Sequence, residues 1–183
     1  MPVAVLEFYT DCLQTIRAHA ESTYPDECCG LLLGKLDDEH SQTKTVVEIW
    51  ATENVWSAEI ANSYLLIDQS IAKASSSVTV PEPGAFDQIL TKTDHYYCIA
   101  PEAMLKGQRY ALSRGLEVIG LYHSHPDHPA IPSQFDQDLA WPKYSYVIVF
   151  VQNGTSQDLR SWVLDETHHF QHEEIVVIKP MKT

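Results

Sequence analysis

Two histidines at the end of an apolar stretch constrain this chain more than any other feature of its sequence. Residues 116–119 are mainly apolar and β-branched, which predicts a strand that runs into His123 and His125. Side chains at positions i and i+2 of a strand point to the same face of a sheet. The two imidazole rings are therefore expected to stand side by side, where they can bind one metal ion together.

A third ligand follows the histidines. Three prolines between positions 126 and 132 interrupt regular structure, so a loop is expected there. Ser133 then begins a predicted short helix that reaches Leu139 and carries Asp136 in its first turn. Two neutral imidazoles and one carboxylate form a three-ligand set that suits catalytic zinc, with water in the fourth position.

The same residues also allow a purely structural interpretation. Ser133 and Asp136 have the S-x-x-D spacing of a capping box, so both side chains can be occupied in starting the helix. His123 and His125 can be ordinary polar neighbours on a strand. The three prolines and the downstream carboxylate favour the metal site, but this region alone leaves both interpretations open.

A second motif lies almost a hundred residues upstream, where Glu27 stands just before the Cys-Gly-Leu-Leu-Leu-Gly segment at 29–34. The downstream motif is His-Ser-His at 123–125, seven residues, Ser133, two residues and Asp136. Together they resemble the JAMM (Mov34/MPN/PAD-1) metalloprotease family, also called the MPN+ domain, in its bacterial-type form. The resemblance covers residues 6–178 with one insertion, and five chemical positions make it specific.

The resemblance implies that His123, His125 and Asp136 bind Zn²⁺. It also implies that Glu27 is the general acid–base and that Ser133 donates to the oxygen of the tetrahedral intermediate. The implied reaction is hydrolysis of a peptide or isopeptide bond after the C-terminal glycine of a ubiquitin-like protein or a small sulfur-carrier protein. That C-terminal tail is the expected partner. The alternative is a metal-free scaffold or protein-binding module, since many MPN domains lack the metal set.

Composition predicts a cytoplasmic globular protein. The 183 residues, 44% of them apolar, suit a single domain at 1–183 with its own core. No stretch predicts a membrane span or a signal sequence. The four cysteines include no C-x-x-C pair, so neither a disulfide framework nor a zinc ribbon is indicated. The net charge of −13 opposes nucleic-acid binding and is compatible with a basic partner or a neutral peptide tail.

The hydrophobic pattern predicts an α/β fold, which is α+β in stricter usage. Its centre is a curved, mixed, mostly antiparallel β-sheet, flanked by two principal helices and a short third one. The resemblance implies the same fold, of the MPN/JAMM, cytidine-deaminase-like type. Besides the elements above, we expect helices at 7–20 and 101–114, strands at 28–34, 45–51 and 170–178, and a hairpin of 144–151 with 159–164 around Asn153-Gly154.

Residues 55–94 depart from the family pattern and are predicted to be an insertion within the domain. A helix is expected from 60 to 73, followed by a Ser/Pro/Gly linker at 74–84. The apolar residues of the insertion suit a hinged flap over the substrate groove. A surface subdomain and a dimer contact remain equally open.

Other reactive side chains are predicted to be structural. Cys28 has no visible dedicated base, so it is expected to pack in a buried strand rather than act as a nucleophile. His19 lies on the first predicted helix and is expected to be structural or solvated. His168, His169 and His172 are expected in a solvated turn and at a strand edge.

Overall fold

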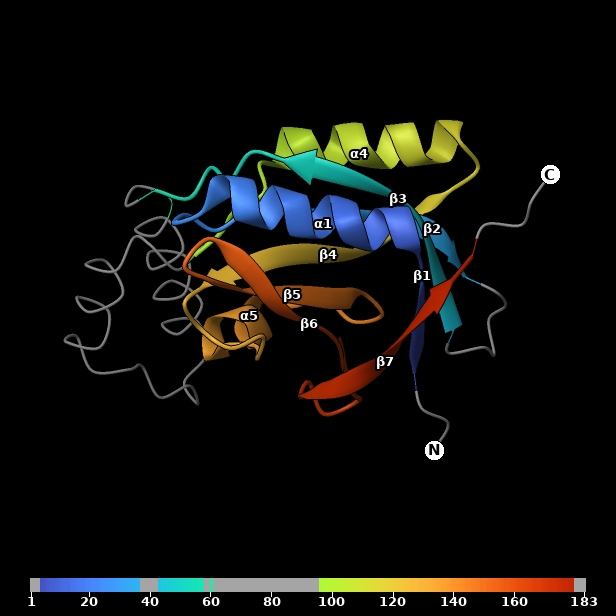
Figure 1. Ribbon diagram of the computed structural model, residues 1–183. Coiled ribbons are helices and arrows are strands. Elements are labelled where there is room, and N and C mark those ends of the chain that lie inside the picture. The colour runs from blue at the N-terminus through green and yellow to red at the C-terminus, as the bar shows by residue number, and fades with distance from the viewer. Residues whose placement is uncertain (1–3, 37–42, 58–59, 61–95, 180–183) are drawn as a thin grey trace, which may run out of the picture.

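The computed structural model describes residues 4–36, 43–57, 60 and 96–179. Within these ranges a sheet of seven strands is accompanied by three helices (Figure 1). In chain order the elements are β1 (Val5–Tyr9), α1 (Thr10–Thr23), β2 (Cys29–Leu36), β3 (Thr43–Thr52), α4 (Pro101–Ser113), β4 (Glu117–Pro126), α5 (Gln134–Leu139), β5 (Ser145–Gln152), β6 (Thr155–Leu164) and β7 (Phe170–Ile178).

The strands follow the order β1-β3-β2-β4-β5-β6-β7, and β7 pairs again with β1, so the sheet closes into a barrel. The pairs β1–β3, β1–β7 and β4–β5 are parallel, and the other four are antiparallel. The predicted α+β fold with a mixed, mostly antiparallel sheet is therefore confirmed. Its curvature goes further than the sequence indicated, because the sheet has no free edge.

The first strand, β1, corrects the sequence prediction at this end of the chain. A helix was expected from Glu7, but Glu7 lies in β1 and α1 begins only at Thr10. Leu6 and Phe8 are both fully buried, and their neighbours in β1 are not. This alternation with period 2 is the pattern of a strand, and it outweighs the helical spacing of the residues that follow.

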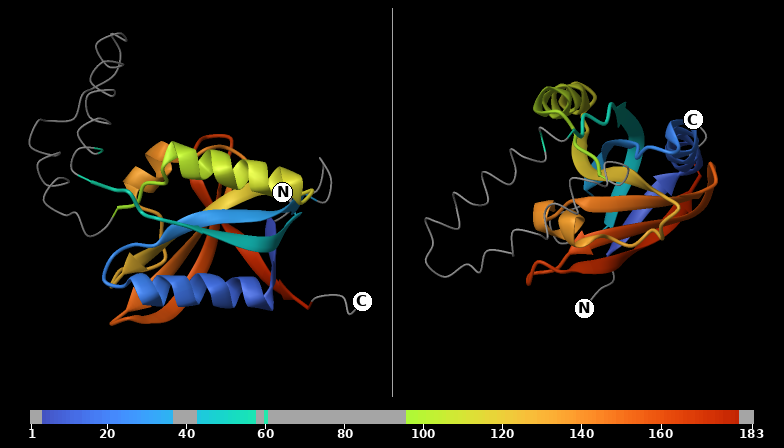
Figure 2. Two further views of the ribbon diagram at one scale, coloured as in Figure 1. Left: turned by 90° about the horizontal axis from the view of Figure 1, so that it is seen from above. Right: turned by 90° about the vertical axis from the view of Figure 1, so that its left-hand side faces the viewer.

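The two long helices pack on opposite faces of the sheet, as both views in Figure 2 show. Side chains of strand β2 are buried on both faces of the sheet, which explains why its sequence is a continuous apolar run. Leu32 belongs to the core that contains Ile16 of α1. Leu31 and Leu33 belong to the core that contains Ala111 of α4. Full burial of each leucine side chain contributes roughly 1.5–3 kcal/mol, so β2 anchors both layers.

Other element ends follow local backbone chemistry. Helix α4 begins at Pro101, as predicted, and is followed by Gly115 with φ of 66°, a conformation that glycine adopts without strain. Asn153 and Gly154 both have positive φ, which matches the turn that joins β5 to β6. Strand β6 begins at Thr155, directly after this turn, and is therefore longer than the predicted strand that started at residue 159.

The predicted insertion falls almost entirely outside the described residues. The expected helix at 60–73 and the linker at 74–84 lie there, apart from residue 60, so the flap, subdomain and dimer-contact interpretations stay predictions. The assignment of 1–183 to a single domain also stays a prediction. Within the described ranges, no helix has the length and apolar character needed to cross a bilayer.

Candidate metal centre

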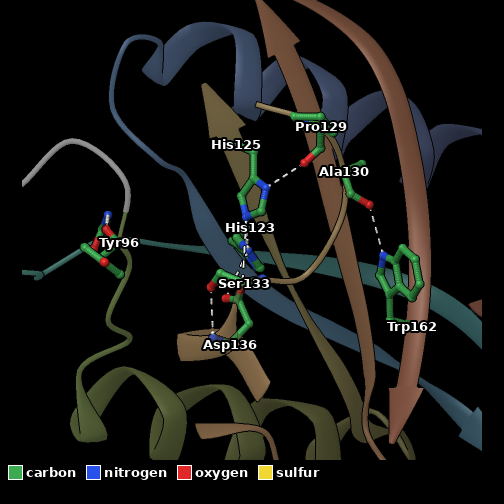
Figure 3. A network of polar contacts seen from close by, with 9 residues as sticks. Tyr96, His123, His125, Pro129, Ala130, Ser133, Asp136 and Trp162 are labelled. Atoms are coloured by element: carbon green, nitrogen blue, oxygen red, sulfur yellow. Dashed lines mark hydrogen bonds and ion pairs between the residues drawn. The ribbon is translucent and has the colours of Figure 1, made fainter. Parts of the chain in front are cut away.

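Strand β4 presents the two histidines of the His-Ser-His motif. It lies between β2 and β5, where His123 is paired with Cys29 on one side and with Ile148 on the other. The His123 side chain is almost completely buried, and that of His125 is 12% exposed. Their ring centroids lie 4.9 Å apart, so the two rings stand side by side as the strand period predicts (Figure 3).

Helix α5 brings Asp136 to the histidines. The Asp136 carboxylate is buried, with Oδ1 3.4 Å from His123 Nε2 and Oδ2 3.8 Å from His125 Nε2. The intervening loop is attached to β6, because Trp162 Nε1 donates to the carbonyl of Ala130 at 3.1 Å. The ligand atoms of His123, His125 and Asp136 all lie within 4.8 Å of one another. These three residues are the group of the described chain that can hold a metal ion.

The capping box is also present, so the structural and the metal interpretations coexist. The backbone N–H and the hydroxyl of Ser133 donate to Asp136 Oδ2 at 2.7 and 2.6 Å. In return, Asp136 N–H donates to Ser133 Oγ at 3.1 Å. Because both donors use Oδ2, Oδ1 remains directed at His123. One carboxylate thus caps α5 and faces the histidines at the same time.

The donor set fits a divalent cation. His125 Nδ1 lies 2.8 Å from the Pro129 carbonyl, and the tautomer that donates this bond leaves a lone pair on Nε2. That Nε2 lies 3.0 Å from His123 Nε2 and close to the Asp136 carboxylate. The lone pairs of these nitrogen and oxygen atoms therefore converge in a buried place. They repel one another unless a proton or a cation lies between them. Nitrogen and oxygen ligands of this kind suit zinc.

Burial also keeps the two imidazoles in the form that a metal ion requires. It lowers the pKa of His123 to about 4, with the Asp136 carboxylate acting in the opposite direction. Burial lowers the pKa of His125 as well, against the effects of the Pro129 carbonyl and Asp136. Both rings are therefore neutral near pH 7. A cation can bind them without first displacing the extra proton of an imidazolium.

Glu27 lies two residues before the start of β2 and is only 5% exposed. Burial, followed by the nearby Asp136 carboxylate, raises its pKa well above the usual value. A dication at the three ligands would oppose this shift by stabilising the carboxylate form. Glu27 shares a groove of about 310 Å³ with one histidine and the serine of the motif; the groove is lined by Glu27, Tyr96, His125, His128, Pro129, Ile131 and Ser133. All five sequence-predicted positions thus meet at one place.

Sequence reasoning missed two residues that shape this centre. Ser124 is fully buried; its hydroxyl accepts a bond from Cys28 N–H at 2.8 Å, and its own N–H donates to the Cys28 carbonyl at 3.1 Å. The sequence held a signal for Ser124. A serine between two histidines that share one face of a strand points to the opposite face, where a buried hydroxyl needs a polar partner. The ring of Tyr97 stacks on that of His123, with ring centroids 4.3 Å apart. No local sequence pattern predicts this contact.

The side chains predicted to be structural lie as follows. His19 Nδ1 is hydrogen-bonded to the buried Tyr122 hydroxyl at 2.8 Å. Burial raises the pKa of the Cys28 thiol to about 11, so the group is a packed thiol rather than a reactive thiolate. The three histidines between 168 and 172 are exposed in the β6–β7 turn and at the start of β7.

The profile of a protein family described as prokaryotic homologs of the JAB domain matches residues 10–165. The chain belongs to this family. The match includes Glu27 and the whole stretch from His123 to Asp136. The resemblance to the bacterial-type JAMM/MPN+ family is therefore confirmed.

Two curated relatives of this JAB-family chain are desampylases. One from Pyrococcus furiosus is 38% identical over 77 residues, which are 42% of this chain and 53% of that protein. One from Haloferax volcanii is 30% identical over 79 residues, 43% of this chain and 57% of that protein. The chain thus spans about half the length of these relatives. A solution structure from Desulfitobacterium hafniense, 20% identical, shares the fold with a TM-score of 0.68 over 97% of this chain and 95% of that chain.

Proposed function

We propose that this JAB-family chain is a zinc-dependent metallopeptidase or isopeptidase. Its proposed substrate is a peptide or isopeptide bond after the C-terminal glycine of a ubiquitin-like or sulfur-carrier protein. The observation that carries the proposal is the convergence of His123, His125 and Asp136 beside the buried carboxylate of Glu27. The similarity to two desampylases supports hydrolysis of this class. A cytoplasmic location belongs to the same proposal.

In this proposal the zinc ion is held by Nε2 of His123 and His125 and by the Asp136 carboxylate. When bound, zinc supplies Lewis-acid activation of water and of the scissile carbonyl. The protein keeps the ligands fixed from several elements. The Pro129 carbonyl orients the His125 ring, and the Tyr97 ring holds the plane of His123 by stacking.

Glu27 is the proposed general acid–base. It lines the same groove as His125 but is not part of the group formed by His123, His125 and Asp136, so its carboxylate is available to exchange a proton rather than act as a ligand. Burial, with the nearby Asp136 carboxylate, raises its pKa well above the usual value, and a raised pKa favours a carboxylate that accepts and returns a proton. It would take the proton of the attacking water and deliver it to the leaving amine.

Ser133 is the proposed donor to the oxygen of the tetrahedral intermediate. Its side chain lines the groove, and its hydroxyl proton is bonded to Asp136 Oδ2. If the hydroxyl turns to a substrate oxygen, the backbone N–H of Ser133 still caps that carboxylate oxygen at 2.7 Å. Removal of a donor of this type costs roughly 2.7–4 kcal/mol in the barrier.

The test uses the purified full chain, loaded with zinc, and a panel of ubiquitin-fold proteins extended beyond their C-terminal glycine. Glu27→Gln should retain zinc while the rate of hydrolysis falls roughly 10²- to 10⁴-fold, since one proton-transfer group is lost. The control is Glu53→Gln, which removes the same charge from an exposed position after β3. It should leave both zinc and rate unchanged.

Two outcomes would contradict the proposal. If Glu27→Gln loses zinc, Glu27 is a ligand or a fold element rather than the acid–base. If the wild-type chain binds no zinc and cleaves none of the panel, the metal-free scaffold described for many MPN domains is the better interpretation.

A further inference from the structure

We propose that Asn54 is a positioning residue for the general acid–base Glu27, an inference that rests on the proposed function. Asn54 stands two residues after the end of β3, where the chain leaves the sheet toward the predicted insertion. It does not belong to the metal group and does not line the groove. Both the nitrogen and the oxygen of its side-chain amide nevertheless form hydrogen bonds with backbone groups around that groove.

The amide nitrogen of Asn54 connects two residues of the groove. Its Nδ2 donates to the carbonyl of Glu27 at 3.0 Å and to the carbonyl of Tyr96 at 3.0 Å. Glu27 and Tyr96 both line the groove, but they are distant in sequence and lie in different segments. One side chain therefore sets the separation between the proposed acid–base and the aromatic residue beside it.

The amide oxygen of Asn54 secures the ends of the junction. Its Oδ1 accepts from Trp56 N–H and from Cys98 N–H, both at 3.0 Å. The backbone adds a further bond at the same place, from Val55 N–H to the Cys98 carbonyl at 3.0 Å. Asn54 thus uses both N–H donors and both lone pairs of its oxygen, which is the full hydrogen-bonding capacity of a side-chain amide. No other residue type of this size offers the same set.

Glu27 is held from its other side by strand β4. The next residue, Cys28, exchanges two hydrogen bonds with Ser124, at 2.8 and 3.1 Å. Ser124 lies between the two histidines, so this contact fixes the backbone near Glu27 relative to the metal ligands. Asn54 supplies the second point of attachment. These two attachments fix the backbone from which the Glu27 side chain extends, and a displacement of about 1 Å in a catalytic group can cost about 10²-fold in rate.

Aromatic packing stiffens the same junction. The rings of Trp56 and Tyr96 lie 5.1 Å apart, and each contacts Phe135, at 5.4 and 4.9 Å. Phe135 is the neighbour of Asp136 in helix α5. The segment that Asn54 fastens is thereby packed against the helix that carries the third ligand, and Figure 3 shows Tyr96 on a segment separate from the ligand group.

Two substitutions separate positioning from simple attachment of the junction. Asn54→Ala removes all four bonds. Asn54→Asp keeps acceptors for Trp56 and Cys98 but loses both donors, so the Glu27 and Tyr96 carbonyls are left without them. If Asn54 positions Glu27, both variants should lower kcat at least tenfold while zinc stoichiometry and the absorption spectrum of the cobalt(II) form stay unchanged. If the residue only fastens the junction, Asn54→Asp should turn over like the wild type, which would overturn the proposal.

The matched control is Thr52→Val. Thr52 Oγ1 donates to the Cys29 carbonyl at 3.1 Å, a comparable bond from the end of β3 to β2 that does not involve Glu27. This variant should keep the wild-type kcat. An equal fall in kcat for Thr52→Val and Asn54→Ala would show a general loss of structure at the end of β3 and would overturn the proposal.

A double-mutant cycle with Glu27→Gln tests whether Asn54 acts through Glu27. In the Glu27→Gln background, Asn54→Ala should change the residual rate less than twofold. A tenfold fall in both backgrounds would show that Asn54 acts independently, which contradicts the inference but leaves the proposed function intact. A wild-type rate for Glu27→Gln alone would instead reject the role proposed for Glu27.

A second readout requires no turnover. The carboxyl ¹³C resonance of Glu27, assigned by its absence in Glu27→Gln, reports the environment of this group in the full chain. Asn54→Ala should shift or split the resonance, and Thr52→Val should leave it in place. An unchanged resonance in Asn54→Ala would overturn the inference even if the wild-type chain cleaves none of the test substrates.

Discussion

Glu173 of β7 is a fully buried carboxylate that has no part in the proposed reaction. Its substitution therefore tests the structure independently of the proposed function. Its carboxylate accepts from Ser145 Oγ at 3.1 Å and from Ser161 Oγ at 2.6 Å, and it lies 3.7 Å from Lys44 Nζ. Lys44 also donates to Ser145 Oγ at 2.8 Å. These four residues link β3, β5, β6 and β7.

Glu173→Leu introduces an apolar side chain of similar size and leaves the Lys44 ammonium with the Ser145 hydroxyl as its partner. Loss of one member of a buried ion pair costs about 3–5 kcal/mol, because the remaining charge stays desolvated. A domain has about 5–15 kcal/mol of stability in total, so this loss is a large fraction of it. The double variant Lys44→Met with Glu173→Leu removes both charges and should recover most or all of the loss.

The loss should also depend on pH. Burial lowers the pKa of Lys44, and Glu173 acts in the opposite direction, so the lysine pKa falls further when Glu173 is removed. Between the folded and unfolded pKa values, the folded state then binds fewer protons than the unfolded state. The unfolding free energy of Glu173→Leu should therefore rise as pH increases through this window. The destabilisation should be largest near pH 7 and smaller near pH 10.

Urea unfolding followed by circular dichroism at several pH values measures these differences. Glu174→Leu, at the exposed neighbouring position of β7, is the control and should change stability by no more than about 0.5 kcal/mol. A loss below about 1 kcal/mol for Glu173→Leu at pH 7, without pH dependence, would refute the reasoning. It would mean that Lys44 reaches water and that the buried pair is not as described.

Two further predictions concern the sheet and the metal group. A Cβ at Gly120 would lie 2.2 Å from the Ser145 carbonyl oxygen, so Gly120→Ala should force β4 and β5 apart and lower the unfolding free energy by roughly 1–3 kcal/mol in denaturant unfolding. His125→Ala should remove zinc and activity together, as metal analysis of the purified variant will show; retention of stoichiometric zinc by a variant lacking both His123 and His125 would contradict the ligand assignment.

The local parts of the candidate site were accessible from the sequence because strand and helix periods are local. The i, i+2 spacing of His123 and His125 predicts rings on one face, and the structure places them so. The S-x-x-D spacing of Ser133 and Asp136 predicts a capping box, and the box is present. The approach of Glu27 to these residues was expected only from the family resemblance, since almost a hundred residues separate it from them.

The contacts that sequence did not predict are long-range. The pairing of β1 with β7 joins the two ends of the chain and closes the barrel, and no local pattern specifies which strands become neighbours. The bonds of Asn54 depend on where residues 96 and 98 lie after the predicted insertion. The helical spacing of the apolar residues was misleading at Glu7, because burial of Leu6 and Phe8 in a sheet outweighs it there.

The carboxylate of Asp136 has a consequence for how this chain can change over evolutionary time. Helix α5 has only six residues, too short to persist without its cap and its packing. A glutamate at 136 would retain a carboxylate but shift it by one methylene from the Ser133 donors. An alanine at 133 would remove the hydroxyl bond to the Asp136 carboxylate and the bond that Asp136 N–H donates to that hydroxyl. Under the proposed function, a substitution at Ser133 or Asp136 would therefore change the affinity for metal and the folding of α5 together.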